Sequence, residues 1–338
     1  MLNGLIIISL GAAILQRLKM IQKILFLILL LCCMSVQWLH ATILPVPNPP
    51  EQNPILVSLG QQLFHDERLS GDRTVSCATC HALETGGMDR EKVSTGIGGK
   101  KGVIRAPSVF NSHLNHTQFW DGRVKTLEAQ VDGPLHDALE MASNWPLVIG
   151  RLNADPQVRS DFKKVFNEEL NPEQVRIALA AFQRTLMLTN SPFDRWLAGD
   201  MEAITAQQKN GFRLFQEYGC ISCHQGANVG GNMFARMGSL ESFTLFKSAD
   251  MERVSLGRYN VTGNRKHLYV FKVPGLRTAA LNHYFFHDSS ANSLEEAVEI
   301  MARVQLGRHL TRDQAQDIAE FIRSLLGEHP MLKQVLSD

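Results

Sequence analysis

Hydrophobic residues along the chain recur mainly at the spacing of an amphipathic helix. Near the C-terminus, Ile318 and Ile322 fall on one face of a segment that begins with the capping pair Thr311 and Gln314, and Gly327 is expected to end this helix. Alternating strand patterns of useful length do not occur, so the chain is predicted to be mainly α-helical. Comparable capping pairs begin further predicted helices at Asn171 with Gln174, Thr205 with Gln208, and Ser293 with Glu296.

Two glycine-rich stretches interrupt the helical pattern and are predicted to be loops. They read STGIGGKKG at residues 94–102 and QGANVGGNMF at residues 225–234, and glycine clusters of this kind favour turns. Upstream of the first predicted helix, the proline-rich residues 43–54 indicate an extended arm.

The beginning of the chain has the layout of a secretory signal peptide. A continuous apolar run at residues 24–36 follows basic residues and precedes small residues around Ala41. The run is short for a membrane span, although a retained anchor stays open as the alternative. We therefore expect residues 1–41 to be a cleaved leader of a periplasmic protein, with Met20 as an alternative start of translation.

Composition and charge narrow the possible classes of function. Charged residues make up 20% of the 338 residues and hydrophobic residues 44%, proportions that are typical of a soluble globular protein. A net charge of +1 gives no reason to expect nucleic acid or an anionic surface as a partner. The length allows two domains, each with its own core.

The candidate chemistry lies in two motifs of the form CxxCH. Such a motif can attach a c-type haem, because the two thiols can add to the vinyl groups while the imidazole binds the iron. A redox dithiol and half of a zinc site are the alternatives. The histidine after each second cysteine favours haem, and no cysteine outside the leader is left to complete a zinc site. The motifs consist of Cys77, Cys80 and His81, and of Cys220, Cys223 and His224.

Each motif precedes one of the glycine-rich loops and lies among its own predicted helices. We therefore predict two tandem, mostly α-helical domains, each enclosing one covalently bound haem c. Residues 42–190 would form the N-terminal domain and residues 191–338 the C-terminal domain, with a junction near residues 191–200.

Long segments occur in a fixed order along the chain after the leader. They read LGQQLFHDERLS, QFWDGRVKTLEAQVDGPLHDALEM, SPFDRWLAGD, FKVPGLR and YFFHDSSANSLEEAVEIMARVQLG. In these segments the chain resembles the bacterial di-haem cytochrome c peroxidases and their MauG-type relatives. The resemblance implies that the two tandem domains are cytochrome-c-like. It also implies periplasmic residence, a homodimer, and reduction of hydrogen peroxide with electrons from a small donor protein, a cytochrome c or a cupredoxin.

The resemblance assigns roles to individual residues. His81 and His224 match the proximal ligands of the peroxidatic and the electron-entry haem, and Met301 matches the second ligand of the electron-entry haem. Trp120 matches a tryptophan that lies between the haems and is thought to couple them. A thioether favours ferrous iron, which suits a haem that receives electrons. MauG-type maturases carry tyrosine at the position of Met301, so methionine favours a peroxidase.

Glu140 and Gln130 match a pair of residues over the open face of the peroxidatic haem. Heterolytic cleavage of the O–O bond needs a proton to be taken from one oxygen and delivered to the other, which a carboxyl group can do. Burial near the haem is expected to raise the pKa of Glu140 toward the working pH. Gln130 cannot titrate, but it can orient peroxide by hydrogen bonding.

Two positions depart from the family pattern. Ile97 stands where family members carry a distal histidine, so we expect an open iron even in the oxidised state and no need for reductive activation; His113 and His116 are less favoured substitutes. Arg105 stands where the family has an asparagine that binds calcium. A guanidinium is no calcium ligand, so calcium is doubtful, and we expect Arg105 to pair with a haem propionate instead.

After the leader, seven further histidines lie outside these assignments. His287 matches a histidine that recurs in the family near the second haem. The others are expected to be solvated or hydrogen-bonded: His65, His136, His267, His283, His309 and His329.

Three functions stay open. In the leading one, a di-haem cytochrome c peroxidase, electrons enter at the haem of His224 and pass by way of Trp120 to the haem of His81. A MauG-type oxidase or maturase that acts on a partner protein is the second, because the distal histidine is missing. The third is a non-catalytic di-haem electron carrier, which would have no use for Glu140 over an open iron.

Overall fold

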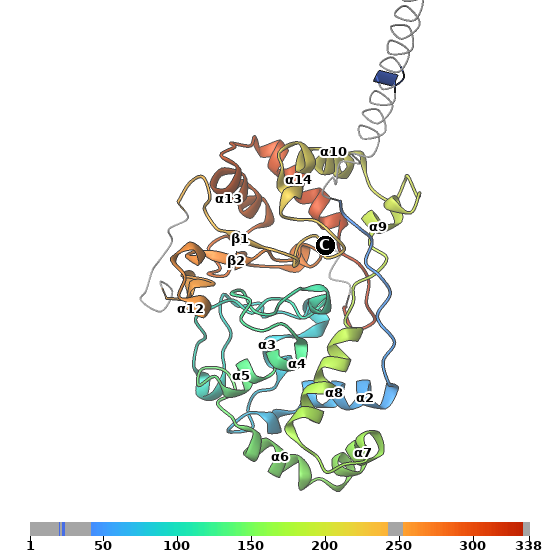
Figure 1. Ribbon diagram of the computed structural model, residues 1–338, viewed down its shortest axis with the longest axis vertical. Helices are drawn as coiled ribbons and strands as arrows, with labels where there is room; N and C mark the ends of the chain where they lie inside the picture. The colour runs from blue at the N-terminus through green and yellow to red at the C-terminus, as the bar shows by residue number, and fades with distance from the viewer. Residues whose placement is uncertain (1–19, 21, 24–41, 243–252, 334–338) are drawn as a thin grey trace, which may run out of the picture. The chain divides into compact units, whose positions relative to one another are not determined.

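The computed structural model describes residues 20, 22–23, 42–242 and 253–333. Contacts divide the chain into the units Met1–Ala41 and Thr42–Asp338, and the elements below belong to the second unit (Figure 1). Most of the predicted leader lies outside the described residues, so its cleavage stays a prediction. No helix within the described ranges is both long and apolar enough to cross a membrane.

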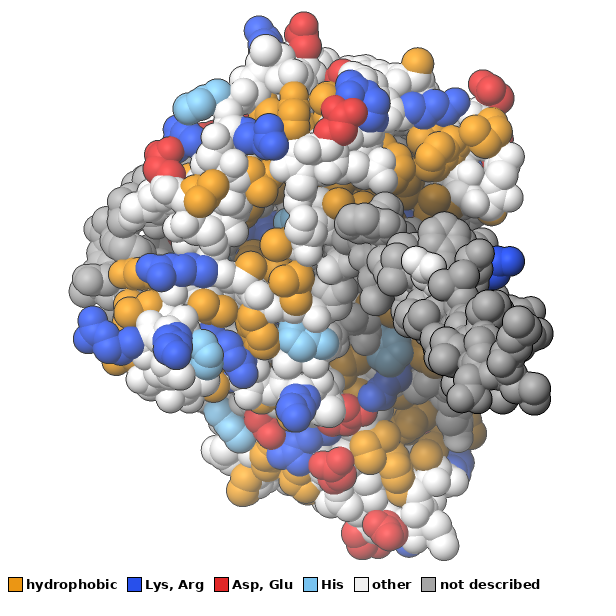
Figure 2. Space-filling view, turned by 45° about the horizontal axis from the view of Figure 1, so that its top comes forward, with side chains coloured by type: hydrophobic (Ala, Val, Ile, Leu, Met, Phe, Trp, Pro, Cys, Tyr) orange, Lys and Arg blue, Asp and Glu red, His pale blue; other side chains and the backbone are white. Residues whose placement is uncertain are grey.

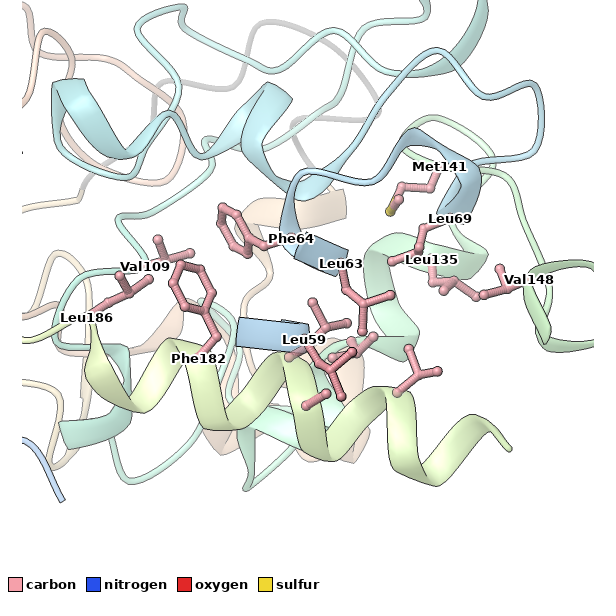
Figure 3. Packing of buried hydrophobic residues seen from close by; sticks show 14 of the residues in the cluster. Leu59, Leu63, Phe64, Leu69, Val109, Leu135, Met141, Val148, Phe182 and Leu186 are labelled. Carbon is pink, nitrogen blue, oxygen red and sulfur yellow. The ribbon is translucent and has the colours of Figure 1, made fainter. Parts of the chain in front are cut away.

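The first half of this unit consists of helices that pack around one central pair. Its helices are α2 (Pro54–Phe64), α3 (Cys77–Cys80), α4 (Leu127–Gln130), α5 (Asp132–His136), α6 (Trp145–Asn153), α7 (Pro156–Phe166) and α8 (Pro172–Thr185). The central pair is α2 and α8 (Figure 1). Their close contact requires Gly60, because a Cβ atom there would lie 1.9 Å from the carbonyl oxygen of Ala178. Figure 3 shows Leu59 and Leu63 of α2 beside α8, with Phe182 on the latter.

The second half repeats this arrangement with different elements. Its helices are α9 (Pro192–Leu197), α10 (Ala206–Glu217), α12 (Tyr259–Thr262), α13 (Leu294–Leu306) and α14 (Arg312–Ser324). Here α10 packs on α14, and Gly211 lets them approach, since a Cβ atom there would lie 1.8 Å from the carbonyl oxygen of Asp317. The strands β1 (Phe234–Arg236) and β2 (Val270–Lys272) pair in antiparallel fashion, with Phe234 opposite Lys272.

Short 3₁₀ turns complete the two halves. They are η1 (Glu67–Leu69), η2 (Leu83–Thr85), η3 (Ile97–Gly99), η4 (Ser112–Leu114), η5 (Cys220–Ser222), η6 (Arg265–His267) and η7 (Ala279–Leu281). The predicted mainly α-helical class is confirmed. The sequence pattern missed the strand pair, because two strands of 3 residues each are too short to show an alternation.

Buried hydrophobic residues form two clusters. Apart from Leu326, the first takes its members from residues 59–188. Apart from Ile43, the second takes its members from residues 193–325. The predicted division into domains at residue 190 stays a prediction, but the change of cluster falls in the same region of the chain.

A buried arginine joins four separate stretches of the chain. Arg277 is 1% exposed, and its guanidinium lies 2.8 Å from the carboxylate of Asp194. It also donates to the backbone carbonyls of Leu44, Ala227 and Leu325, at 2.8, 2.9 and 3.4 Å. This side chain therefore ties the N-terminal arm, the junction and the end of α14 to the loop after the second motif.

The predicted helix starts are largely as expected, whereas one predicted end is wrong. The capping residues Asn171, Thr205 and Thr311 accept hydrogen bonds as expected. Ser293 also caps its helix, but the Glu296 carboxylate accepts from the backbone of the residue before the cap, Asn292.

Helix α14 ends at Ser324, before the predicted stop at Gly327. A Cβ atom at Gly327 would lie 2.5 Å from the carbonyl oxygen of Thr189. This glycine therefore serves a close contact between chain segments and does not cap the helix.

Charges of both signs share the surface. Figure 2 shows Lys and Arg side chains interspersed with Asp, Glu and hydrophobic side chains on one face of the molecule. This mixture agrees with the net charge of +1.

Candidate functional site

The first CxxCH motif forms the short helix α3 and holds its histidine in one orientation. The Thr79 hydroxyl accepts from the backbone N–H of Ser76 at 2.9 Å, which fixes the start of the helix. The Nδ1 of His81 lies 3.1 Å from the carbonyl oxygen of Gly87, so Nδ1 carries the proton and Nε2 is left with a free lone pair. Burial lowers the pKa of His81, which keeps the ring neutral. A neutral imidazole with free Nε2 is the form that binds iron.

The second motif reaches the same arrangement through a different turn. Residues Cys220–Ser222 form η5 after Gly219, whose φ of 90° lies in the left-handed region that favours glycine. The Nδ1 of His224 lies 3.3 Å from the carbonyl oxygen of Val229. Burial lowers the pKa of His224 to about 4, so this ring is also neutral at physiological pH.

The thiols of both motifs are free. Burial raises the pKa of Cys77 to about 12 and that of Cys220 to about 11. Partly buried, unpaired thiols beside neutral imidazoles fit two thioether-linked haem groups. Their raised pKa values do not suit a redox dithiol, which needs a lowered thiol pKa.

A cavity of about 160 Å³ brings several of the predicted site residues together. Cys220 and His224 lie on its wall, and Met301 reaches it from α13. Trp120 and Arg105 line it from the first half of the chain. An imidazole and a thioether on the wall of one apolar cavity are a donor pair that suits a haem iron.

Arg105 is buried at this cavity, and no carboxylate of the described residues forms a salt bridge with it. Its Nη2 donates to Asn282 Oδ1 at 2.9 Å and to Met88 Sδ at 3.3 Å. Its Nε is buried and has no hydrogen-bond partner in the described part of the chain. Burial lowers the pKa of Arg105 to about 10, with Asp89 opposing this, so the guanidinium is still charged at neutral pH. An unpaired buried donor at the cavity wall fits a carboxylate of a bound haem.

A calcium site would need several ligands that converge on one point. Among the described residues, no group of three or more His, Cys, Asp and Glu side chains converges as a metal site would require. Because calcium also binds carbonyl oxygens, its absence stays a prediction.

Hydrogen bonds at both ends hold Trp120. Its indole N–H donates to the carbonyl oxygen of Arg105 at 2.8 Å. Its own carbonyl accepts from the backbone N–H of Lys272 at 2.8 Å. The ring also meets His287 edge to face, with centroids 6.3 Å apart. The indole is therefore fixed at the cavity wall.

Glu140 lies near the first motif. Burial is the main cause that raises the pKa of Glu140 to about 6; the charge of Asp137 adds to the rise and Arg123 opposes it. The pKa of Cys80 is raised by burial and, to a smaller extent, by the charges of Asp89 and Glu140, which shows that Glu140 is close to the motif. The direction of this shift is the one expected from the sequence.

The loop at residues 94–102 supports the backbone of Glu140. The Ile97 N–H donates to the Glu140 carbonyl oxygen at 2.8 Å. Gly96 packs closely against the backbone of Leu139, since a Cβ atom at Gly96 would lie 2.0 Å from the carbonyl oxygen of Leu139. Gln130 ends α4, and within the described residues its partly buried amide has no hydrogen-bond partner that would prevent it from reaching a ligand.

The two histidines considered as substitutes for a distal ligand have other surroundings. His116 Nδ1 lies 2.8 Å from the carbonyl oxygen of Gly231, and its ring meets Phe234 edge to face at 4.9 Å. Burial lowers the pKa of His113, and the charge of Arg184 adds to this effect. Neither observation favours a ligand role.

The other histidines have ordinary contacts. His287 is 5% exposed, its Nε2 lies 2.9 Å from Ser255 Oγ, and its ring stacks on Phe271 at 4.4 Å. Hydrogen-bond distances to a neighbouring oxygen are found for His65, His267 and His329. His136 packs on Trp145.

Lys272 is a cavity residue that sequence reasoning missed. It belongs to β2, is 7% exposed, and lines the same cavity as His224 and Met301. Burial lowers the pKa of Lys272 to about 8, with Asp121 opposing this. The only available signal was its place in the segment FKVPGLR, and nothing in that segment separates a buried lysine from an exposed one.

Comparisons with known proteins agree with this site. The family model for di-haem cytochrome c peroxidase matches residues 54–202. The cytochrome c peroxidase Ccp of Escherichia coli (strain K12) is 43% identical over 284 residues, which cover 84% of this chain and 60% of that protein. This chain therefore spans about three fifths of that relative's length.

Two further similarities extend over nearly whole chains. The cytochrome c551 peroxidase of Nitrosomonas europaea is 40% identical over 290 residues, which cover 86% of this chain and 85% of that protein. The crystal structure of a MauG-like protein associated with microbial copper homeostasis superposes with a TM-score of 0.74 at 25% identity, covering 90% of this chain and 99% of that one. The motifs, the cavity and these similarities together show that the chain belongs to the di-haem cytochrome c peroxidase family.

Proposed function

We propose that this protein is a di-haem cytochrome c peroxidase, which reduces hydrogen peroxide to water with electrons from a small donor protein. The observation that carries the proposal is the contrast between the two motifs. Glu140, with its pKa near 6, accompanies the first motif, whereas Met301 shares a cavity with the histidine of the second. One centre thus has acid-base chemistry beside it and the other has a second iron ligand.

Haem c bound at both motifs would supply irons that exchange single electrons and, at the first motif, a position for peroxide. The chain would hold these groups through Cys77, Cys80 and His81, and through Cys220, Cys223, His224 and Met301. The free Nε2 atoms and the unpaired thiols support this assignment.

Glu140 is proposed to move the proton during cleavage of peroxide. A carboxyl group with a pKa near 6 is ionised in most molecules at pH 7 and is easily reprotonated, so it can accept a proton from one oxygen and return it to the other. Gln130 is proposed to orient peroxide with its amide. The loop that contacts the Glu140 backbone through Ile97 would keep the carboxyl group in place.

Trp120 is proposed to couple the two centres. It lines the cavity of His224 and is hydrogen-bonded to Arg105. Arg105 in turn donates to Met88, the residue after Gly87, whose carbonyl holds His81. This series of contacts supports a short path from one histidine ligand to the other centre. Arg105 is also proposed to pair with a haem propionate in place of calcium.

A MauG-type oxidase or maturase is the second candidate. The missing distal histidine at Ile97 and the likeness to a MauG-like structure favour it. Met301 at the second centre argues for the peroxidase, because the maturases carry tyrosine there. A non-catalytic electron carrier is disfavoured by Glu140, since a carrier has no need of an acid-base group.

Peroxide turnover with ferrocytochrome c separates the three functions. We expect the fully oxidised protein to consume peroxide and ferrocytochrome c together without prior reduction, because Ile97 cannot close the first iron. Storage of oxidising equivalents without donor consumption would indicate the maturase, and no reaction would indicate the carrier. A low-spin bis-histidine spectrum of the oxidised protein would contradict the open iron.

Periplasmic residence, cleavage of the leader and a homodimer belong to the same proposal. Export of the full chain and its N-terminal sequence after secretion test the first two. Sedimentation of the holoprotein tests the dimer.

A further inference from the structure

Two buried cations lie on the wall of a single cavity. Arg105 is 4% exposed and Lys272 is 7% exposed, and both line the cavity that also holds His224 and Met301. They come from distant parts of the chain. The first precedes Trp120 in sequence, and the second ends the strand β2.

Trp120 links the backbones of these two residues. Its indole N–H donates to the carbonyl oxygen of Arg105, and its carbonyl accepts from the N–H of Lys272, each at 2.8 Å. The cations are therefore fixed with respect to the same indole ring. Asn282 adds an anchor, because its side-chain oxygen accepts from the Arg105 guanidinium at 2.9 Å.

In the described part of the chain neither cation forms a salt bridge, although the charge of Asp89 acts on Arg105. Within the described ranges, no Asp or Glu lies within salt-bridge distance of Arg105 or of Lys272. Asp121 is the acidic residue whose charge acts on Lys272, and its carboxylate already pairs with Arg123 at 3.1 Å. Buried charges are costly unless they are paired, so two uncompensated cations at one cavity indicate an anionic ligand with two negative groups.

We propose that Lys272 and Arg105 together bind the two carboxylate groups of the haem attached at Cys220 and Cys223. This inference rests on the proposed function in that it requires a haem at the second motif. A haem carries two carboxylates, which match the two cations in number and sign. The guanidinium can bind one carboxylate through its unpaired Nε, while the ammonium acts as a point charge on the other.

The two cations Arg105 and Lys272, called the clamp from here on, also affect the midpoint potential of that haem. Fixed positive charge near the iron disfavours the ferric state, which carries one more positive charge than the ferrous state. Arg105 and Lys272 would therefore make the second centre a better electron acceptor, in the same direction as the thioether of Met301. The charges come from side chains, so the effect does not depend on a bound metal ion.

Redox titration of the holoprotein tests the clamp. The variant Lys272→Met removes the charge and keeps a side chain of similar length. We expect it to shift the ferric-to-ferrous equilibrium of the methionine-ligated haem about tenfold toward ferric, which lowers the midpoint potential by about 59 mV. Lys272→Arg, which retains the charge, should stay near wild type. Lys266→Met serves as the matched control, because that lysine is exposed.

The titration distinguishes a failure of the clamp from a failure of the proposed function. Lys272→Gln is measured alongside, so that a folding defect particular to methionine does not decide the result. Unchanged potentials in both neutral variants would overturn the clamp, even if the wild type contains two haems and turns over peroxide. Absence of haem or of peroxide turnover in the wild type would instead refute the proposed function.

Discussion

Replacement of Glu140 by glutamine is expected to make the protein more stable and less active. The carboxyl group loses hydration on folding, which raises its pKa from an ordinary value of 4.5 to about 6. Glutamine has nearly the same shape but cannot ionise. It therefore removes the cost of the buried charge and, with it, the proposed proton transfer.

The sign and size of the stability effect follow from the pKa. Because the folded pKa lies above the unfolded one, folding is favoured below pH 4.5, and this contribution is lost as the pH rises through about 6. A shift of this size corresponds to about 2 kcal/mol at pH 8, as an upper bound because solvent still reaches part of the side chain. Glu140→Gln should therefore raise the free energy of unfolding by up to about 2 kcal/mol at pH 8, and by almost nothing at pH 4.5.

Activity should change in the opposite direction. In the wild type, kcat/KM for peroxide is expected to rise with pH through about 6, because the ionised carboxyl accepts the first proton. The variant should lose this pH dependence and fall in rate by about 10² to 10⁴, the usual contribution of acid-base catalysis.

Urea denaturation at pH 4.5 and pH 8, together with steady-state turnover over the same range, measures both effects. Glu84→Gln is a suitable control, since that carboxyl lies in the turn after the first motif and has no assigned role. The reasoning is refuted if Glu140→Gln retains wild-type turnover and its acidic limb. Destabilisation that is larger at pH 8 than at pH 4.5 would show that the carboxylate is held by interactions that outweigh its burial.

Three further substitutions test other parts of the account. Gly96→Ala should lower the free energy of unfolding by about 1–3 kcal/mol in thermal melts, because the added methyl group would overlap a backbone oxygen, whereas Gly150→Ala on an open helix surface should not destabilise. Arg277→Met should lower the free energy of unfolding by about 3–5 kcal/mol in urea denaturation, because it leaves the Asp194 charge buried and unpaired. A second substitution, Asp194→Asn, should recover part of this loss. Met301→Leu should lower the midpoint potential of the second haem and convert its spectrum to high spin, and an unchanged spectrum would exclude the thioether as a ligand.

Local signals explain what could be predicted from the sequence. A capping residue and the helix behind it are neighbours in the chain, so the starts at Asn171, Thr205 and Thr311 were predictable. The CxxCH motifs are similarly local, because the same few residues place both thiols and the imidazole. The end of α14 was predicted wrongly, because Gly327 is required by a close contact with Thr189, which is distant in sequence.

The cavity could be predicted only in part for the same reason. Resemblance to a family pointed to Trp120, Met301 and Arg105, although no pattern along the chain brings them together. Lys272 could not be predicted, because the sequence around a buried lysine in a strand of 3 residues does not differ from that around an exposed lysine. Burial and the lack of a salt bridge among the described residues are properties of the folded molecule. These two properties make Lys272 a candidate for binding an anionic ligand.

The two motifs show how similar local sequences acquire different functions. In each, burial keeps the histidine neutral, and a backbone carbonyl a few residues downstream orients its ring, so the motif alone would give two equivalent centres. The difference comes from segments distant in sequence: the loop that carries Glu140 approaches the first motif, and α13 brings Met301 to the cavity of the second. Exchanging what lies opposite each histidine, rather than the motifs themselves, should therefore exchange the roles of the two centres.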